Sequence, residues 1–288
     1  MRLLVTGAGG QLGGDLRSVA SAAGYEVTGT AHLECDIADA ARVAIVLDDL
    51  RPDVVINCAA WTKVDAAETA EDAAYRVNVL GPGVLADACA ARELLLVHAS
   101  TDYVFDGTAR QPISEDTPPA PRSVYGRTKL EGEGAVRERA PRHIIVRTSW
   151  LYGREGPNFI RTMLRIAATG EPPRVVADQV GSPTWTGHLA PAMLRLVERG
   201  ATGTYHLTNS GSTSWHGLAD LVFEAAGLPL RALPISTAEY PTAAARPAYS
   251  VLDNRHWREL GEPPLQAWQD GVRSYVEELR LSGLLPAG

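Results

Sequence analysis

The sequence has few of the residues that mark a secreted or zinc-binding protein. Its 288 residues include three cysteines, Cys35, Cys58 and Cys89, and no two of them are close in sequence. An odd number of widely spaced cysteines argues against a disulfide framework and against a zinc site. We therefore expect free, buried thiols in the reducing cytoplasm.

Long hydrophobic runs and a surplus of basic residues are also missing. No stretch approaches the roughly 18 consecutive apolar residues of a membrane helix, and the apolar run after Met1 is too short for a signal peptide. The formal net charge is −7, whereas nucleic-acid phosphates attract basic surfaces. We expect a cytoplasmic protein with no membrane segment and no nucleic-acid partner.

The first forty residues are typical of a nucleotide-binding β-α-β unit. An apolar run at 3–6 predicts a strand, glycines follow, and helical spacing from 11 to 23 leads to a second strand in YEVTGT. Gly7 permits a tight turn, Gly10 lets the backbone approach a pyrophosphate, and Gly13 lets the helix pack closely. The spacing Gly-x-x-Gly-x-x-Gly differs from the commonest fingerprint. Its position between strand and helix still predicts dinucleotide binding.

The end of the second predicted strand bears on which cofactor binds. No acidic residue stands at Thr30, Ala31 or His32, where a carboxylate would bind the ribose of NAD and repel a 2′-phosphate. This favours NADPH, and NADH stays an alternative because no arginine stands there either. We expect Asp36 either to contact the adenine or to cap the helix that begins near Asp39.

The rest of the chain predicts an α/β protein with a Rossmann-type, doubly wound parallel sheet. Strands are expected within 53–61, 94–105 and 143–153, with helical stretches between them. We place the nucleotide-binding domain at 1–150 plus about 186–209, where a helix leads into the strand GTYHLTN. Residues from about 151 to 185 and 210 to 288 should form a smaller, interleaved C-terminal substrate-binding lobe. Trp257 and Trp268 are expected in the core of that lobe.

The stretch SVYGRTKLEGE suggests a reductase. Tyr125 and Lys129 would lie one helical turn apart, and Ser123 would cap their helix. Carbonyl reduction needs a hydride, which a nicotinamide supplies, and a proton, which a phenol supplies if its pKa falls from about 10. The lysine charge would lower that pKa. Thr101, or failing that Ser100, would complete the site from a neighbouring strand end.

These motifs resemble, in order along residues 1 to about 270, the extended short-chain dehydrogenase/reductases. The segments STDYVFDG, SWLYG and DQVGSPT are most similar to the dTDP-4-dehydrorhamnose reductase family. The resemblance implies an NADP(H)-dependent oxidoreductase that reduces the C4 ketone of a dTDP-4-dehydro-6-deoxy-L-hexose, with dTDP-4-dehydro-L-rhamnose as the first choice. Three alternatives stay open: a related dTDP-ketosugar reductase of secondary metabolism, an epimerase, and a non-catalytic NADP-binding regulatory subunit.

The resemblance also implies site residues. The implied catalytic residues are Thr101, Tyr125 and Lys129. The implied cofactor contacts are Gly7, Gly10, Gln11, Leu12, Gly13, Asp36, Ala59, Ala60 and Thr62, together with Tyr125 and Lys129. The implied substrate contacts are Tyr103, Trp150, Asn158 and Gln179.

Arg246 is a further substrate candidate on chemical grounds. It precedes Pro247 on a stiff segment, and a guanidinium suits a diphosphate; a structural salt bridge is the alternative. Some family members have a magnesium-linked dimer interface, and Asp15 stands where one of its acids lies. No convincing partner cluster accompanies Asp15, so no metal ligand is predicted and magnesium binding stays open. The expected state is a monomer or homodimer that binds a dTDP-linked 4-ketosugar.

Overall fold

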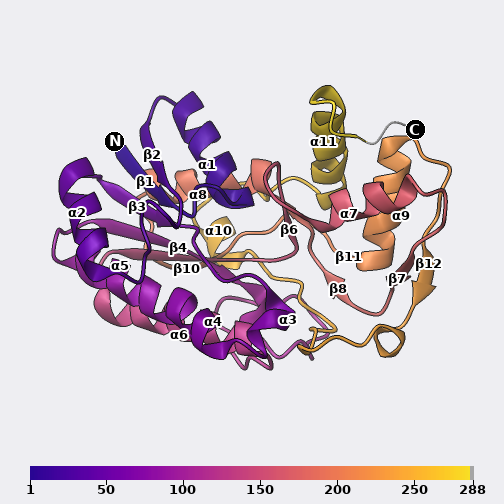
Figure 1. The fold of residues 1–288 in the computed structure, drawn as a ribbon, viewed down its shortest axis with the longest axis horizontal. Coiled ribbons are helices and arrows are strands. Elements are labelled where there is room, and N and C mark those ends of the chain that lie inside the picture. Colours follow the sequence, from indigo (N-terminus) through magenta and orange to yellow (C-terminus); the bar gives the residue numbers. More distant parts are fainter. Residues whose placement is uncertain (286–288) are drawn as a thin grey trace.

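The computed structural model describes residues 1–285, and its main body is built on one parallel sheet (Figure 1). The sheet has six strands in the order β10-β5-β4-β3-β1-β2. Their bounds are β1 Arg2–Thr6, β2 Glu26–Thr30, β3 Val54–Asn57, β4 Leu95–Thr101, β5 His143–Thr148 and β10 Gly203–His206. All five pairings are parallel, so the predicted Rossmann-type sheet is confirmed.

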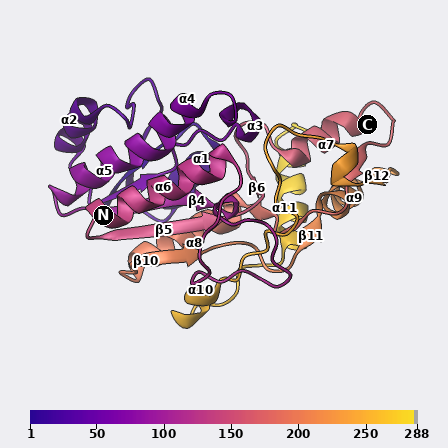
Figure 2. The same ribbon diagram turned by 90° about the horizontal axis from the view of Figure 1, so that it is seen from below.

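Helices cover both faces of this sheet (Figure 2). On one face α1 (Gln11–Ala22) packs against α8 (Thr186–Glu198); on the other lie α2 (Ala40–Leu50), α5 (Gly81–Ala90) and α6 (Val124–Arg139). Because strand side chains alternate, Leu3 and Val5 enter the first core while Leu4 enters the second. Burial on both faces explains why the strands read as continuous apolar runs.

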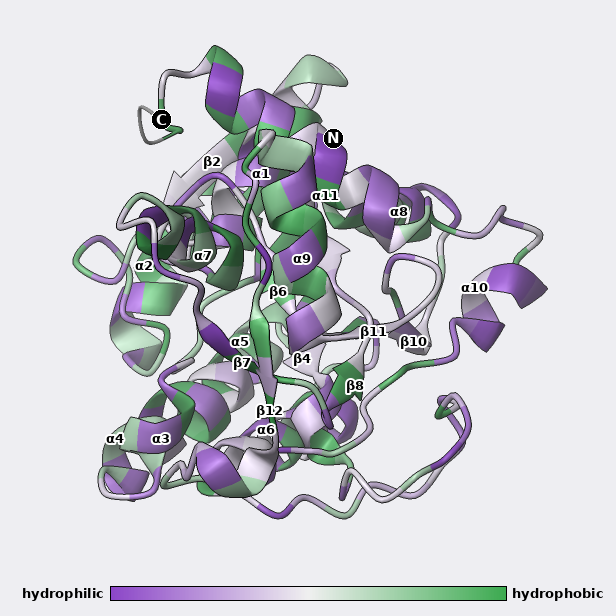
Figure 3. Ribbon diagram, turned by 90° about the vertical axis from the view of Figure 1, so that its right-hand side faces the viewer, coloured by the Kyte–Doolittle hydropathy of each residue, from purple (hydrophilic) through white to green (hydrophobic). Residues whose placement is uncertain are grey.

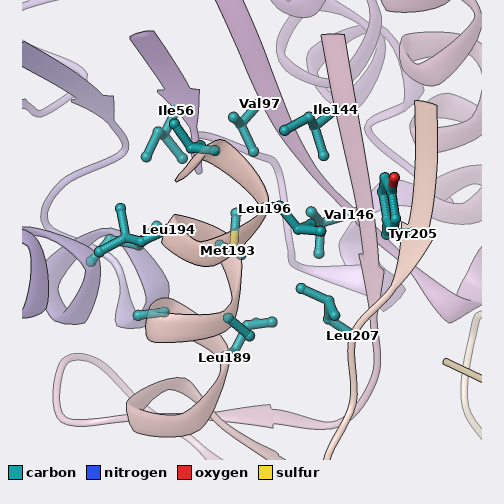
Figure 4. Close-up of a cluster of buried hydrophobic side chains, with 14 of the residues drawn as sticks. Ile56, Val97, Ile144, Val146, Leu189, Met193, Leu194, Leu196, Tyr205 and Leu207 are labelled. Carbon is teal, nitrogen blue, oxygen red and sulfur yellow. The ribbon is translucent and has the colours of Figure 1, made fainter. Parts of the chain in front are cut away.

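Residues after the fifth strand leave the sheet and then return to it. The strand β10 lies beside β5, and α8 packs on α1. Leu189, Met193 and Leu207 fill the core between α8 and the strands (Figure 4). Trp257 belongs to this core, so its predicted place in the lobe was wrong, whereas Trp268 lies in the lobe core.

A smaller lobe stands at the carboxyl ends of the strands, on the right of Figure 1. Its helices are α7 (Phe159–Ala167), α9 (Trp215–Ala226) and α11 (Trp268–Leu281). Short strand pairs join them: β6 Leu151–Tyr152 with β9 Thr184–Trp185, β8 Val180–Gly181 with β11 Thr213–Ser214, and β7 Arg174–Val176 with β12 Leu233–Ile235. Hydrophobic bands alternate with polar ones along α9 (Figure 3), which packs on α7 and α11 around a separate hydrophobic core.

Short helical turns complete the chain. They are α3 Val64–Ala67, α4 Glu71–Tyr75, the π-turn η1 Arg76–Leu80, the 3-10 turns η2 Asp102–Val104 and η3 Thr237–Glu239, and α10 Arg255–Glu259. The turns α3, α4 and η2 pack against α6. They therefore help to hold α6 over the carboxyl end of β4.

Candidate active site

The glycine-rich turn between β1 and α1 is tightly packed. Gly7 has φ +67°, and a Cβ added to it would lie 2.6 Å from the backbone nitrogen of Ala59. A Cβ on Gly13 would overlap the backbone of the turn itself, so Gly13 brings α1 close to the turn. No side chain caps α1 at Gly10. The first N–H groups of α1 are therefore available to an anionic ligand, as dinucleotide phosphates require.

The neighbouring predicted cofactor contacts have mixed environments. Leu12 points into the hydrophobic core, which leaves only its backbone for a ligand. Gln11 donates to the carbonyl of Pro157 at 3.1 Å, and its buried Oε1 has no partner among the described residues. Ala59, Ala60 and Thr62 follow the end of β3, and Ala59 lies against the turn. A small turn with uncapped amides and an unpartnered amide oxygen fits a dinucleotide.

Asp36 does not cap a helix. The cap of α2 is Asp39, which accepts from the backbone N–H of Arg42 at 3.0 Å, so the capping alternative for Asp36 was wrong. Asp36 forms a 2.7 Å ion pair with Arg76 and accepts from Ala38 N–H. Partial burial opposes ionisation, but these two partners hold the pKa of Asp36 below its usual value. Contact with the adenine stays a prediction.

The three predicted catalytic residues come from β4 and α6. Thr101 ends β4, and Tyr125 and Lys129 lie one turn apart on α6. All three side chains are buried. Ser123 caps α6 by accepting from Gly126 N–H at 3.1 Å, as the sequence predicted. Thr101 lies close enough to the Tyr125 side chain to influence its pKa. Lys129 Nζ donates to the carbonyl of Ala99 at 2.7 Å.

The protonation of this site differs from the expectation for Tyr125. Burial raises the pKa of Tyr125 above its usual value, although the nearby Thr101 opposes that rise. The expected lowering of the Tyr125 pKa by the charge of Lys129 is not found. Burial lowers the pKa of Lys129 itself to about 8. A phenol that stays protonated at neutral pH is a proton donor, which is the form that carbonyl reduction needs.

Tyr103 and Arg246 lie next to this site. The Tyr103 ring meets the Tyr125 ring edge-on, with centroids 5.4 Å apart, and Arg246 lies close enough to lower the pKa of its hydroxyl, although burial raises that pKa overall. Arg246 forms an ion pair with Asp65 at 2.5 Å. Its Nη1 is buried without a partner among the described residues. The salt-bridge alternative is therefore present, and one donor of the guanidinium is left over.

A cavity of about 410 Å³ opens beside Tyr103. Three segments line it: 105–110 after the catalytic strand, 122–123 before α6, and 245–249. Three arginines, Arg110, Arg122 and Arg246, are among its lining residues. This charge suits an anionic group such as a diphosphate.

Trp150 and Gln179 meet around a residue that the sequence did not single out. The Trp150 ring stacks on Trp215 with centroids 3.6 Å apart and planes 4° from parallel. Trp215 Nε1 donates to Gln179 Oε1 at 3.2 Å. Trp150 has φ +48°, a backbone conformation that is unfavourable for a bulky residue. Such strained conformations cluster at functional sites. Nothing in the spacing of the two tryptophans predicts their contact.

The side chain of Asn158 already makes hydrogen bonds within the lobe. Its Oδ1 caps α7 through Arg161 N–H, and its amide nitrogen donates to Gly153 O and to the hydroxyl of Tyr275, both at 2.9 Å. Both amide hydrogens are therefore in use. A contact between this amide nitrogen and a substrate would require one of these hydrogen bonds to break.

Neither a cluster of metal-binding side chains nor a membrane-spanning helix is found in the described part of the chain. Among residues 1–285, no group of three or more His, Cys, Asp or Glu side chains could hold a metal ion. Asp15 accepts a hydrogen bond from the hydroxyl of Thr186. No helix in the part of the chain that the structure describes has both the length and the apolar character to span a bilayer.

Comparison with known proteins gives consistent matches along the chain. The family described as the RmlD substrate binding domain matches residues 1–281. A probable dTDP-4,6-dihydroxy-2-methyloxan-3-one 4-ketoreductase of Streptomyces antibioticus is 45% identical over 97% of this chain and 96% of its own. A dTDP-4-dehydrorhamnose reductase of Streptomyces griseus is also 45% identical, over 93% of this chain and 90% of its own.

Solved structures agree with these matches. The dTDP-4-dehydrorhamnose reductase of Bacillus anthracis, solved in complex with NADP, superposes with a TM-score of 0.94 at 39% identity. The superposition covers 96% of this chain and 99% of that one.

Proposed function

Because the chain belongs to the dTDP-4-dehydrorhamnose reductase family, we propose that it reduces the C4 ketone of a dTDP-4-dehydro-6-deoxy-L-hexose with NADPH. The preferred reaction is dTDP-4-dehydro-L-rhamnose to dTDP-L-rhamnose. The observation that carries the proposal is the burial of Thr101, Tyr125 and Lys129 together, with Thr101 at the end of β4 beside the Tyr125 side chain and Lys129 one turn further along α6. Relatives named as dTDP-4-dehydrorhamnose reductases and a neighbour that binds NADP support it.

The glycine turn is the proposed place for the pyrophosphate of the cofactor. Gly7, Gly10 and Gly13 would leave room for it, and the first N–H groups of α1 would bind its oxygens. When bound, the nicotinamide supplies a hydride to C4 of the sugar. Thr101 and Tyr125 would hold the ketone oxygen, and Tyr125 would give that oxygen its proton, so that C=O becomes CH–OH. Lys129 would place its charge beside the phenolate that remains.

We propose that the sugar nucleotide lies between Tyr125 and the lobe. Tyr103 would contact the sugar, and Arg246 would bind the diphosphate in the arginine-lined cavity. The stacked pair of Trp150 and Trp215 would offer a flat apolar surface on the lobe side. In this proposal, 1–150 with about 186–209 binds the cofactor, and about 151–185 with 210–288 binds the sugar nucleotide.

A related ketosugar reductase of secondary metabolism is the second candidate. It is favoured by the Streptomyces antibioticus relative, whose name gives a different 4-ketosugar. Both candidates share the chemistry of Tyr125 and differ in the sugar. A regulatory subunit without activity would have no need of the buried Thr101–Tyr125 pair.

The test combines dTDP-4-dehydro-6-deoxyglucose, a 3,5-epimerase, the purified chain, and either NADPH or NADH. Oxidation of the cofactor is followed by its absorbance, and the stereochemistry of the product identifies the sugar. Tyr125→Phe should lose most of kcat and keep its affinity for NADPH, because only the proton donor is removed. Tyr240→Phe, at an exposed position, is the matched control. A near wild-type rate in Tyr125→Phe would contradict the mechanism.

A further inference from the structure

A row of buried polar side chains runs beneath Lys129. Thr6, Asn57 and His98 are direct neighbours in the parallel register of β1, β3 and β4. They share the face of the sheet that α6 covers, because Leu4, Val55 and Leu96 lie two residues before them in that core. The four side chains of the row, Thr6, Asn57, His98 and Lys129, are 0%, 1%, 0% and 2% exposed. Water cannot reach them to satisfy a mismatched donor, so each hydrogen must have a partner within the protein.

The orientation of the Asn57 amide follows from its partners. One of its atoms accepts from the backbone N–H of Ala59 at 3.1 Å, and a backbone N–H only donates, so that atom is Oδ1. The hydroxyl of Thr6 donates to the same oxygen at 2.7 Å. The amide nitrogen of Asn57 therefore faces His98, and it can only donate a hydrogen bond.

This amide determines which nitrogen of His98 holds the proton. The Asn57 nitrogen lies 3.0 Å from His98 Nδ1, so Nδ1 must be unprotonated and accept. Burial lowers the pKa of His98 well below its usual value, and the charge of Lys129 lowers it further. A neutral ring with a bare Nδ1 has its hydrogen on Nε2.

That hydrogen points toward the catalytic lysine. His98 Nε2 lies 3.4 Å from Lys129 Nζ. An ammonium has three hydrogens and no lone pair, so it would bring a second donor against the Nε2–H. An uncharged amine has a lone pair that accepts this hydrogen while Nζ still donates to Ala99 O at 2.7 Å.

The other titratable groups around Lys129 do not cancel this preference. Glu133, on α6, favours the ammonium, but its carboxylate also binds Arg147 and Ser100. Cys58, after β3, has a thiol whose pKa burial raises to about 12, so it is neutral at working pH. Burial itself favours the amine.

On the basis of the proposed reductase function, we propose that His98 is a positioning residue whose Nε2–H disfavours the ammonium form of Lys129 and so sets the alkaline limit of activity. The reduction needs the ammonium beside the developing phenolate. Activity should therefore fall as the pH rises through the pKa of Lys129, which burial places at about 8. Loss of the Nε2–H should move this limit to higher pH.

The chain suits a direct measurement because it has two lysines, Lys63 and Lys129. Labelling the lysine Cε with 13C gives two signals, and the exposed Lys63 is an internal reference. His98→Asn keeps an amide near Asn57 and removes the donor that faces Lys129. His98→Gln is long enough to turn an amide oxygen to Lys129. We expect the Lys129 titration midpoint to rise by about one pH unit, and more in the Gln variant than in the Asn variant.

Thr6→Val is the matched control. It removes one hydrogen bond to Asn57, but Ala59 N–H still orients the amide, so the Lys129 midpoint should stay within about 0.2 of the wild-type value. An unchanged midpoint in both His98 variants would overturn the inference. If those variants do not fold, 15N spectra of wild-type histidine decide: a hydrogen on Nδ1 of His98 refutes the inference, and one on Nε2 supports it.

The pH profile of kcat/KM separates this inference from the proposed function. The alkaline limb should move with the Lys129 midpoint, whereas a purely structural His98 would lower activity equally at every pH. Suppose that the wild type turns over no dTDP-ketosugar but the Lys129 midpoint shifts in the His98 variants. The reductase function would then be rejected, and the influence of His98 on Lys129 would stand. Turnover with an unchanged midpoint would reject the effect and keep the function.

Discussion

Replacing Asp102 with asparagine should make the protein less sensitive to pH. Asp102 follows Thr101 at the end of β4 and is 3% exposed. Its Oδ1 accepts from the Thr101 hydroxyl at 3.0 Å, while Oδ2 is buried without a partner among the described residues. Burial raises the pKa of Asp102 to about 6, although the hydrogen bond from Thr101 opposes that rise.

The size of the effect follows from linkage. The pKa of Asp102 is about 6 in the folded chain and has the ordinary value of 3.8 in the unfolded chain. The folded state therefore binds the proton more tightly, and this stabilisation is complete below pH 3.8 and lost as the pH rises through 6. Between pH 5 and pH 8 the wild type should lose about 1.4 kcal/mol of unfolding free energy from this residue. The asparagine side chain of the variant cannot ionise, so the variant should lose none of it.

Urea unfolding of the wild type and Asp102→Asn at pH 5 and pH 8 tests this. The asparagine nitrogen adds a buried donor, but its cost is the same at both pH values, so only the difference between them matters. Asp49→Asn, at an exposed position of α2, controls for the general loss of a carboxylate. Equal effects of Asp102→Asn at the two pH values would refute the reasoning.

Three further substitutions test other parts of the structure. Gly7→Ala should weaken NADPH binding at least tenfold in a fluorescence titration, because Gly7 has φ +67° and an added Cβ would meet neighbouring backbone. The control Gly9→Ala, with open space around its Cβ, should bind NADPH normally. Glu133→Gln should lower the unfolding free energy in urea by about 3–5 kcal/mol, because it leaves a buried arginine without its charge partner; an effect below about 1 kcal/mol would contradict this. Trp215→Ala removes the ring that stacks on Trp150, so the KM for the sugar nucleotide should rise about tenfold with a smaller change in kcat; an unchanged KM would place the sugar nucleotide elsewhere.

The sequence by itself determines the sheet and the local geometry of the catalytic helix. Apolar runs predict buried parallel strands because both faces of such a sheet are covered. Glycine at position 7 predicts the turn because that backbone conformation is costly for other residues. The spacing of Tyr125 and Lys129, and the cap at Ser123, depend only on the period of one helix.

Only the tertiary structure decides which distant side chains meet and how they ionise. The stack of Trp150 on Trp215 and the place of Trp257 in the main core depend on how the lobe returns to the sheet. The pKa of Tyr125 rises because burial outweighs the opposing influence of Thr101, and the expected lowering by Lys129 is absent. The contact of His98 with Lys129 joins a strand to a helix through their packing. Spacing along the chain describes neighbours within one element, whereas burial and donor pairing depend on every element that closes around a side chain.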